Sequence, residues 1–420
     1  MSAARTGRAA DVVRVASGNF VEMYDFMVFG YFADAIGAAY FPGGSQLATL
    51  LKALATFGAG FLMRPLGAVV LGAFTDRHGR RAGLLLTLAL MSVGIVTLAF
   101  TPGYGTIGVA APLLVLAGRL LQGFSAGAEL GNVSVYLAEI APPGRRGFYV
   151  AWQSASQQVA VVTAAVIGVA LHAALAPAQV ADWGWRVPLA LGCAVVPVLF
   201  LLRRHLRESD AFAARDHVPT LAEIGGGLRE AWRAVLGGVG LVLMTTVSFY
   251  MITVYTPTFG KLLHLPERAT LWVTAAVGAS NLVWLPLMGA LSDRIGRKPI
   301  LIACTASAIL TAYPAMAWLA GAPSVARLVA VELWLSALYG SYNAAMVVRL
   351  TEVVPAAVRA SGFSLAYSLA TAVGGFTPFI VTWLIARTGN PAIPGAWLGL
   401  AAALSLAAAL FAHRAVADRG

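Results

Sequence analysis

Charged residues are scarce in this chain, and their scarcity excludes a water-soluble globular protein. Only 11% of its 420 residues are Asp, Glu, Lys or Arg, whereas 59% are hydrophobic. The mean hydropathy is +0.78. So few polar side chains cannot cover the surface of a soluble protein of this length. The composition therefore predicts a protein that crosses a membrane several times.

Cysteine and the common nucleotide-binding and catalytic motifs are also lacking. The two cysteines, Cys193 and Cys304, stand alone in apolar stretches, without the spacing of a disulfide framework or a zinc site. No P-loop, dinucleotide-binding glycine pattern or catalytic-triad signature is found in the sequence. We therefore predict neither an enzyme nor an ATP-driven pump, and we expect no cofactor and no bound metal.

Long apolar runs fill most of the chain. They extend over about 20 residues, the length that a membrane-spanning helix needs, and they lack the alternating pattern of barrel strands. The prediction is an all-α membrane protein with twelve spanning helices, at 17–40, 47–73, 82–101, 110–138, 148–174, 184–203, 235–259, 269–291, 299–320, 325–348, 360–386 and 394–413.

The positive charges predict the orientation of these helices. Most of the 29 Lys and Arg residues lie in one set of alternate loops, together with the two termini. Because basic loops stay in the cytoplasm, both termini are expected there. The net charge of +11 comes from basic residues that are spread over short loops, as orientation in the membrane alone requires. No nucleic-acid partner is therefore predicted. The first apolar run carries Asn19, Glu22 and Asp25, and does not resemble a cleaved signal peptide.

Two repeats divide the chain into halves. The segment from Gly72 to Arg81 recurs from Gly289 to Lys298, and both fit the pattern G-x-x-x-D-R-x-G-R-[RK]. A second, looser repeat relates 137–148 to 350–361. Between the halves lies the most polar stretch of the chain. We predict a six-helix bundle at 1–202, a cytoplasmic linker at 203–233 and a second six-helix bundle at 234–420. Tandem repeats of helices are common in transporters.

These motifs resemble those of the major facilitator superfamily, as does the sequence Arg119-Leu-Leu-Gln122-Gly123 in the fourth predicted span. Segments 17–26, 60–67, 123–131 and 152–159 are similar to the metabolite-proton symporters within it, especially those that carry citrate and tricarballylate. The resemblance covers the whole chain. It implies a multi-pass protein of the bacterial inner membrane that works by alternating access, and we expect a monomer.

Ionisable side chains inside the spans are candidates for proton coupling, because each is costly in hydrocarbon unless it has a partner or faces a polar cavity. Asp25 and Glu22 share a helix face, and Glu129 lies in the fourth span. The resemblance implies that Asp25 pairs with Arg119. Two interpretations stay open for this pair: a proton switch, or a static salt bridge between the first and fourth spans.

Two arginines inside the spans predict an anionic substrate. Arg64 and Arg119 can each donate two parallel hydrogen bonds to a carboxylate, which suits a polyanionic substrate better than a sugar. The resemblance implies that this substrate is citrate or a similar tricarboxylate. The alternative for Arg64 is that it neutralises Glu129 or a helix C-terminus. Uncharged residues that could complete the site are Asn19, Tyr24, Gln122, Gln153, Gln157, Tyr250, Tyr255 and Asn343. The glutamines, with Gln158, could equally join neighbouring helices.

Two further ionisable residues lie near the outer ends of their spans. Lys52 could reach the interface by snorkelling. Glu332 lies only a few residues into its span, within expected reach of outer water.

Charged residues at the inner ends of the spans are predicted to gate transport. The aspartates of the repeated loops can be held by arginines and by the N-terminus of a facing helix. The resemblance implies the same role. The predicted gating residues are Asp76, Arg77, Arg80, Glu139, Arg146, Asp293, Arg294, Arg297, Glu352 and Arg359. The alternative is that the basic residues serve only to orient the protein.

The sequence thus predicts a proton-coupled importer of citrate or a similar tricarboxylate, with protons and the organic acid as its small-molecule partners. A carrier of another organic acid, such as a dicarboxylate, is the first alternative. A multidrug exporter fits less well, because an exporter usually has a larger apolar cavity without two arginines. A non-transporting membrane receptor would leave the gating loops unexplained.

Overall fold

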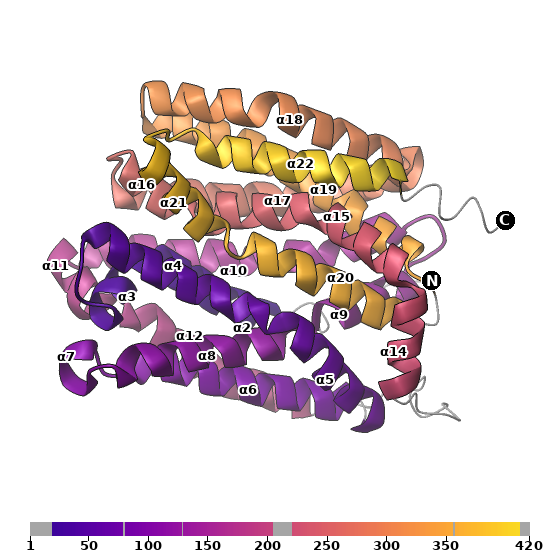
Figure 1. Ribbon diagram of the computed structural model, residues 1–420, viewed down its shortest axis with the longest axis horizontal. Coiled ribbons are helices and arrows are strands. Elements are labelled where there is room, and N and C mark those ends of the chain that lie inside the picture. The colour runs from indigo at the N-terminus through magenta and orange to yellow at the C-terminus, as the bar shows by residue number, and fades with distance from the viewer. Residues whose placement is uncertain (1–18, 79, 128, 205–220, 356–357, 412–420) are drawn as a thin grey trace, which may run out of the picture.

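Helices are the only regular secondary structure in the described part of the chain, which contains no strand (Figure 1). The computed structural model describes residues 19–78, 80–127, 129–204, 221–355 and 358–411. For a few of these residues only the backbone is described. The expected all-α fold is confirmed for this part of the chain.

The first half of the chain forms helices that lie in the lower part of Figure 1. Their bounds are α2 (Asn19–Tyr31), α3 (Ala33–Tyr40), α4 (Gln46–Leu62), α5 (Arg64–His78), α6 (Arg80–Phe100), α7 (Tyr104–Ile107), α8 (Ala110–Ala126), α9 (Glu129–Ile140), α10 (Arg146–Ala174), α11 (Pro177–Gln179), η1 (Val180–Gly184) and α12 (Arg186–Arg204).

The second half forms helices that lie mainly in the upper part of Figure 1. They are α14 (Leu221–Glu230), α15 (Trp232–Phe249), η2 (Tyr250–Val254), α16 (Thr256–Leu262), α17 (Glu267–Ile295), α18 (Arg297–Gly321), α19 (Val325–Val353), α20 (Arg359–Gly374), α21 (Thr377–Thr388) and α22 (Ile393–Phe411). Helix α10 of the first half packs extensively against α17 of the second. Of the predicted linker, residues 205–220 lie outside the described part.

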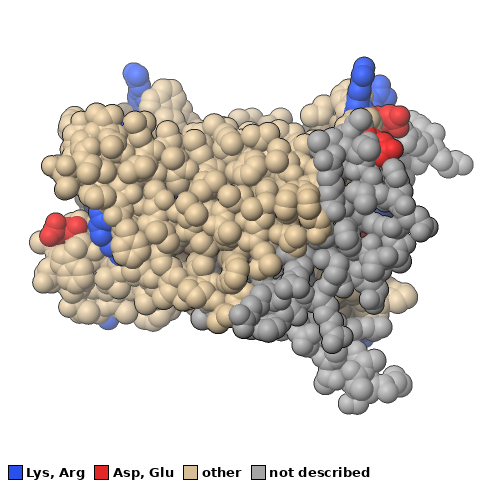
Figure 2. Space-filling model, turned by 90° about the horizontal axis from the view of Figure 1, so that it is seen from below, with Lys and Arg blue, Asp and Glu red and all other residues tan. Residues whose placement is uncertain are grey.

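Eight helical stretches within the described residues are long and apolar enough to cross a membrane. They are 46–75, 110–140, 146–174, 232–254, 267–295, 297–321, 359–388 and 393–410. Shorter apolar helices cover 85–100 and 186–197. The first and tenth predicted spans are helical but fall outside this set, because charged and uncharged polar side chains lower their mean hydropathy. Figure 2 shows a broad uncharged band between charged ends on one face of the molecule.

Several predicted spans contain breaks. Three of the breaks precede a proline near the start of the next helix, at Pro65, Pro257 and Pro378. Proline has no backbone N–H to continue the hydrogen-bond ladder, so the helix ends there and restarts in a new direction. At one of these sites, the segment Tyr250–Val254 is wound as a π-helix. The bends bring side chains from several helices toward the middle of the molecule.

Two glycines of the motifs have clear structural roles. Gly296 has φ +86°, a left-handed conformation that favours glycine, and it separates α17 from α18 in the second repeated loop. Gly123 lets α8 touch α4, since a Cβ at this position would lie 1.7 Å from the Gly60 carbonyl oxygen. Small residues allow this close approach of helices in membranes.

The two ends of the molecule are named here by their loops. The repeat end carries the α5–α6 and α17–α18 junctions, and the opposite end carries α3, α11 and α16 (Figure 1).

Candidate functional site

Two ion pairs lie buried in the first half, between α2 and its neighbours. Arg119 Nη1 of α8 is 2.9 Å from Asp25 Oδ2, and Arg64 of α5 pairs with Glu22. All four side chains are at most 4% exposed. The pairing of Asp25 with Arg119 that the resemblance implied is therefore present. Arg64 has Glu22 as a counter-ion, a partner that the sequence did not predict.

Aromatic rings surround both guanidinium groups. The Arg119 guanidinium carbon lies 3.9 Å from the ring centre of Phe29 and 5.1 Å from that of Phe26. Arg64 lies over Phe61, at 5.2 Å. Such contacts stabilise a cation although the ring itself carries no net charge. They keep both arginines in a dry region next to their acids.

Both arginines retain hydrogen-bonding capacity. Arg119 Nη1 also donates to Gln122 Oε1 at 2.7 Å. Within the described residues, Arg119 Nε and Nη2, Arg64 Nε and Asp25 Oδ1 are buried without a hydrogen-bond partner. Because an arginine presents five donors, these pairs leave room for a further acceptor such as a carboxylate.

A small cavity of about 10 Å³ lies between the two halves, beside Arg64. Its size corresponds to about one water molecule. Its lining comes from α2, α5, α9 and α10 in the first half and from α15, η2 and α20 in the second: Met23, Arg64, Leu130, Gln157, Thr246, Phe249, Tyr250, Tyr367 and Thr371. Three predicted binding residues, Arg64, Gln157 and Tyr250, thus meet here. Sequence reasoning missed Thr246 and Thr371, since single threonines in apolar spans carry no distinctive signal.

The other predicted binding residues do not line this cavity. Tyr24 donates to the Pro188 carbonyl at 2.9 Å, and Tyr255 accepts from Thr382 at 3.1 Å. Gln153 accepts from Ser154 at 2.8 Å. Asn343 is fully buried, and its amide has no hydrogen-bond partner in the described part of the chain. The side chain of Asn19 lies outside the described residues.

Three further ionisable residues have distinct surroundings. Lys52 is exposed, and its Nζ lies 3.3 Å from the Gly43 carbonyl, as expected of a side chain that reaches the interface. Glu129 is buried in α9. The expectation that Glu332 reaches outer water is wrong: it is 3% exposed, because α19 packs this face against neighbouring helices, and its Oε1 lies 3.0 Å from Thr256 Oγ1.

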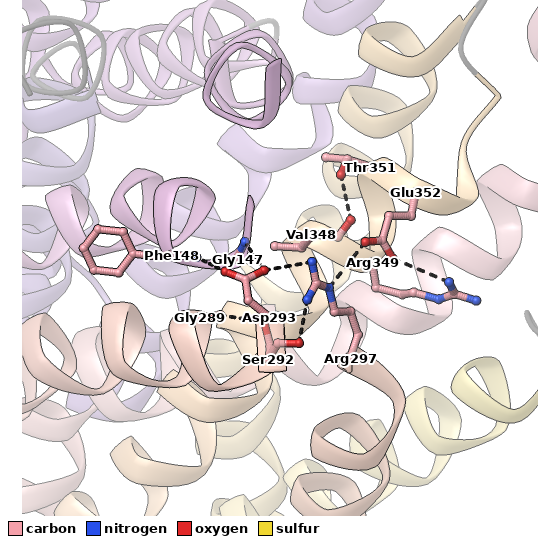
Figure 3. Close-up of polar contacts among 10 residues, drawn as sticks. All are labelled: Gly147, Phe148, Gly289, Ser292, Asp293, Arg297, Val348, Arg349, Thr351 and Glu352. Carbon is pink, nitrogen blue, oxygen red and sulfur yellow. Dashed lines mark hydrogen bonds and ion pairs between the residues drawn. The ribbon is translucent and has the colours of Figure 1, made fainter. Parts of the chain in front are cut away.

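At the repeat end, Asp293 joins the two halves (Figure 3). Its Oδ1 accepts from the N–H of Gly147 at 2.8 Å, and its Oδ2 accepts from that of Phe148 at 3.1 Å. These N–H groups belong to the first turn of α10, where the helix dipole favours a negative charge. The predicted attraction between this aspartate and a facing helix N-terminus is confirmed.

Arg297 extends this contact to α19. Its Nη2 lies 3.0 Å from Asp293 Oδ1, and its Nε lies 3.3 Å from Glu352 Oε1. The latter separation fits an ion pair, although the groups lack the alignment of a hydrogen bond. Arg349 approaches Glu352 at 3.6 Å. Three predicted gating residues, Asp293, Arg297 and Glu352, therefore form one cluster (Figure 3).

The remaining predicted gating residues are outside this cluster or outside the described part. The side chains of Asp76, Arg77 and Arg80 are among those not described. Glu139, Arg146 and Arg294 are exposed. Arg359 has its Nε buried without a described hydrogen-bond partner.

A second network joins the halves at the opposite end, and sequence reasoning missed it. Lys261 Nζ of α16 lies 2.9 Å from Asp34 of α3 and 3.1 Å from Glu267 of α17. His172 of α10 lies 3.1 Å from the same glutamate. Burial alone would lower the pKa of Lys261, but its hydrogen bonds and ion pairs with the two acids outweigh burial and raise it. Asp34, His172, Lys261 and Glu267 all line a cavity of about 590 Å³, which we call the vestibule.

Comparison with known proteins finds full-length relatives. Residues 15–367 match the Major Facilitator Superfamily. The chain is 54% identical over 416 residues to a citrate-proton symporter of Klebsiella pneumoniae, covering 99% of this chain and 94% of that protein. It is 54% identical over 406 residues to a citrate-proton symporter of Salmonella typhi, covering 96% and 94%. The crystal structure of a D-xylose-proton symporter shares the fold, with a TM-score of 0.75, 19% identity and 96% of each chain covered.

Proposed function

Since the chain belongs to the Major Facilitator Superfamily, we propose that it imports citrate or a similar tricarboxylate together with protons. The observation that carries this proposal is the presence of two buried acid–arginine pairs, one of which includes Arg64, a residue that lines the cavity between the halves. Two cations and two titratable acids at one place can bind an anion and exchange protons. The identity to curated citrate-proton symporters over nearly the whole chain supports the same substrate.

We propose the membrane arrangement that the loop charges predict. Twelve spans form two bundles, at 1–202 and 234–420, with the linker 203–233 and both termini in the cytoplasm of a bacterium. The positions of the two groups of helices in Figure 1 support this division. The repeat end then faces the cytoplasm and the vestibule faces outward. The protein acts as a monomer in the inner membrane.

Binding proceeds by exchange of partners. A proton neutralises Asp25 or Glu22 and releases its partner, Arg119 or Arg64, to a substrate carboxylate. The substrate then replaces the acid as the counter-ion, so the guanidinium group is never left unpaired. An unpaired buried charge is strongly unfavourable, which couples the two events. The cavity must widen, since small-molecule sites occupy about 300–1,000 Å³. Gln157, Tyr250 and Tyr367 supply further hydrogen bonds.

The two sets of polar contacts that join the halves, one at each end of the molecule, act as the gates of alternating access. The cluster of Asp293, Arg297 and Glu352 holds the cytoplasmic end closed. Lys261 and its acids hold the outer end. Opening one end while the other stays closed exposes the central cavity to each side in turn.

Transport by proteoliposomes tests this function. With the membrane potential clamped at zero, an inward gradient of one pH unit supports about tenfold accumulation for each coupled proton. We expect accumulation of labelled citrate that a protonophore abolishes. Asp25→Asn should lower the limiting accumulation at least about tenfold, the loss of one coupled proton, while citrate exchange persists. The exposed acid of η1 gives a matched control, Asp182→Asn, which should transport normally. Uptake indifferent to the protonophore would disprove proton coupling.

A thermal-shift panel distinguishes the substrates. Citrate and tricarballylate should stabilise the purified protein more than malate or 2-oxoglutarate at equal concentration. Greater stabilisation by malate or 2-oxoglutarate would favour the dicarboxylate carrier instead.

A further inference from the structure

Glu332 is a buried acid without a cation. It lies in the first half of α19, and in the described part of the chain no ion pair includes it. The charged groups on helices packed around this part of α19 are His172, Lys261, Glu267 and Arg268, and Arg327 lies on α19 itself. His172, Lys261 and Glu267 pair with one another or with Asp34, and Arg327 donates to the Trp318 carbonyl. Oε2 of Glu332 is buried without a described hydrogen-bond partner.

The hydrogen bonds around Thr256 show where a proton is needed. Its hydroxyl oxygen lies 2.9 Å from the Ile252 carbonyl and 3.0 Å from Glu332 Oε1. A threonine hydroxyl has only one hydrogen, so it can donate to only one of these oxygens at a time. If it donates to the carbonyl, the short contact with Glu332 requires a hydrogen on the carboxyl group. A protonated Glu332 that donates to Thr256 satisfies both contacts.

Burial favours the same state. A carboxylate in an apolar site without a counter-ion is far less stable than a carboxylic acid that donates a hydrogen bond. Both arginines of the central site lie elsewhere and are occupied by other acids. Glu332 therefore differs from Asp25 and Glu22, whose charges are balanced.

The position of Thr256 connects Glu332 to both functional regions. Thr256 begins α16, one residue after the end of the π-helical segment η2. Tyr250, at the start of η2, lines the central cavity. Lys261, at the end of α16, joins the network of the vestibule. A change in the protonation of Glu332 therefore acts on the η2–α16 segment, which lies between the central cavity and the vestibule. Single turns of π-helix often occur at functional sites.

Polar groups also lie on both sides of Glu332. Pro257 and Thr258, which follow Thr256, line the vestibule. One turn along α19, Ser336 Oγ lies 3.1 Å from Ser280 Oγ of α17. Farther on, Asn281 and Asn343 are fully buried, and their amides have no hydrogen-bond partner among the described residues. Polar side chains of α16, α17 and α19 thus lie on both sides of Glu332, between the vestibule and the middle of the molecule.

We propose that Glu332 is a second proton-binding residue of the transport cycle, located in the second half of the chain. This inference rests on the proposed proton-coupled uptake. Glu332 takes a proton from water in the vestibule and donates a hydrogen bond to Thr256. It releases the proton when the cycle exposes it to the cytoplasm. Each turnover then carries this proton in addition to the one coupled through Asp25.

Accumulation at a fixed gradient measures the number of coupled protons. With zero membrane potential and one pH unit across the proteoliposome membrane, each coupled proton multiplies the limiting citrate ratio by about ten. Glu332→Gln keeps the shape and the hydrogen-bond donor of the protonated acid. We expect it to exchange citrate at a rate within about twofold of wild type, with a limiting ratio about tenfold lower. Asp182→Asn should match wild type. A Glu332→Gln ratio equal to that of wild type overturns the proposal.

Infrared spectroscopy gives a measurement that needs no transport. Purified wild type at neutral pH should show the carbonyl band of a protonated buried carboxyl group. The band should be missing in Glu332→Gln and shifted in Thr256→Val, which removes the hydroxyl partner. If one variant does not fold, the other still assigns the band. A wild-type spectrum without the band overturns the proposal. A band that is unchanged in both variants also overturns it. Failure of wild type to accumulate citrate would disprove the proposed function, while the band would still decide the state of Glu332.

Discussion

At the scale of single residues, Arg119 and Asp25 depend on each other. Each is at most 3% exposed, and the rings of Phe26 and Phe29 exclude water around the guanidinium group. In such a site, the removal of one charge leaves the other uncompensated. Removal of both is much less harmful, because no buried charge remains.

Arg119→Ala should therefore destabilise the protein by about 3–5 kcal/mol. Adding Asp25→Asn to this variant should restore most of the stability, since the amide needs no counter-ion. Neither variant should accumulate citrate. Thermal unfolding of the purified proteins measures the difference, and equal melting temperatures for the single and double variants would contradict the mutual dependence.

At the scale of helices, breaks and close contacts determine which side chains reach the centre. The π-helical turn of η2 and the start of α5 at Arg64 bring Tyr250 and Arg64 to one cavity. Gly123 allows α8, which carries Arg119, to lie directly on α4. The position of Arg119 over Phe57 of α4, at 5.5 Å, follows from this contact.

Gly123→Ala should separate α4 from α8. Its Cβ would overlap the backbone carbonyl of Gly60, which cannot rotate away as a side chain could. Overpacking of this kind costs about 1–3 kcal/mol. Gly399→Ala in α22 is the matched control, because a Cβ there meets nothing within 4 Å. Thermal unfolding should show a lower melting temperature for Gly123→Ala alone, with weaker citrate binding. A fully stable Gly123→Ala variant would mean that the helices are not in tight contact.

At the scale of the whole molecule, polar contacts join the two halves at both ends at once. Asp293 joins α17 to α10 at the repeat end, and Lys261 joins α16 to α3 at the opposite end. Between them, the central cavity has room for about one water molecule. The structure therefore represents a state with little access to the proposed binding site, and transport requires that either end opens.

Asp293→Asn should favour opening of the repeat end. The variant keeps the size of the side chain but loses the charge that faces two N–H groups and Arg297. Hydrogen bonds to charged groups contribute about 1.5–3 kcal/mol each. Loss of one such contribution shifts the open-to-closed ratio by about tenfold to a hundredfold.

Labelling of a cysteine introduced near Gly147 measures this opening. The rate should rise in Asp293→Asn and stay near that of the parent in Glu230→Gln, which alters an exposed acid of α14. Unchanged labelling in both variants would show that Asp293 does not hold this end closed.

The sequence by itself determined the class of the protein and much of its local structure. Apolar runs require helices, because the backbone must satisfy its own hydrogen bonds in lipid. The repeated loop singled out Asp293 as a residue that a helix N-terminus could hold, although only the tertiary structure showed that this helix is α10. The resemblance to a family indicated the pairing of Asp25 with Arg119. These features depend on residues close together in the chain or on a recognisable pattern.

Only the tertiary structure decided which distant side chains meet. The partner of Arg64, the network of Lys261 and the contact between Thr256 and Glu332 each join separate helices. The convergence of Thr246 and Thr371 on the cavity has the same origin. Such contacts depend on how far each helix is rotated and where it bends. Apolar composition specifies neither, because lipid-facing and buried faces of these helices are similarly hydrophobic.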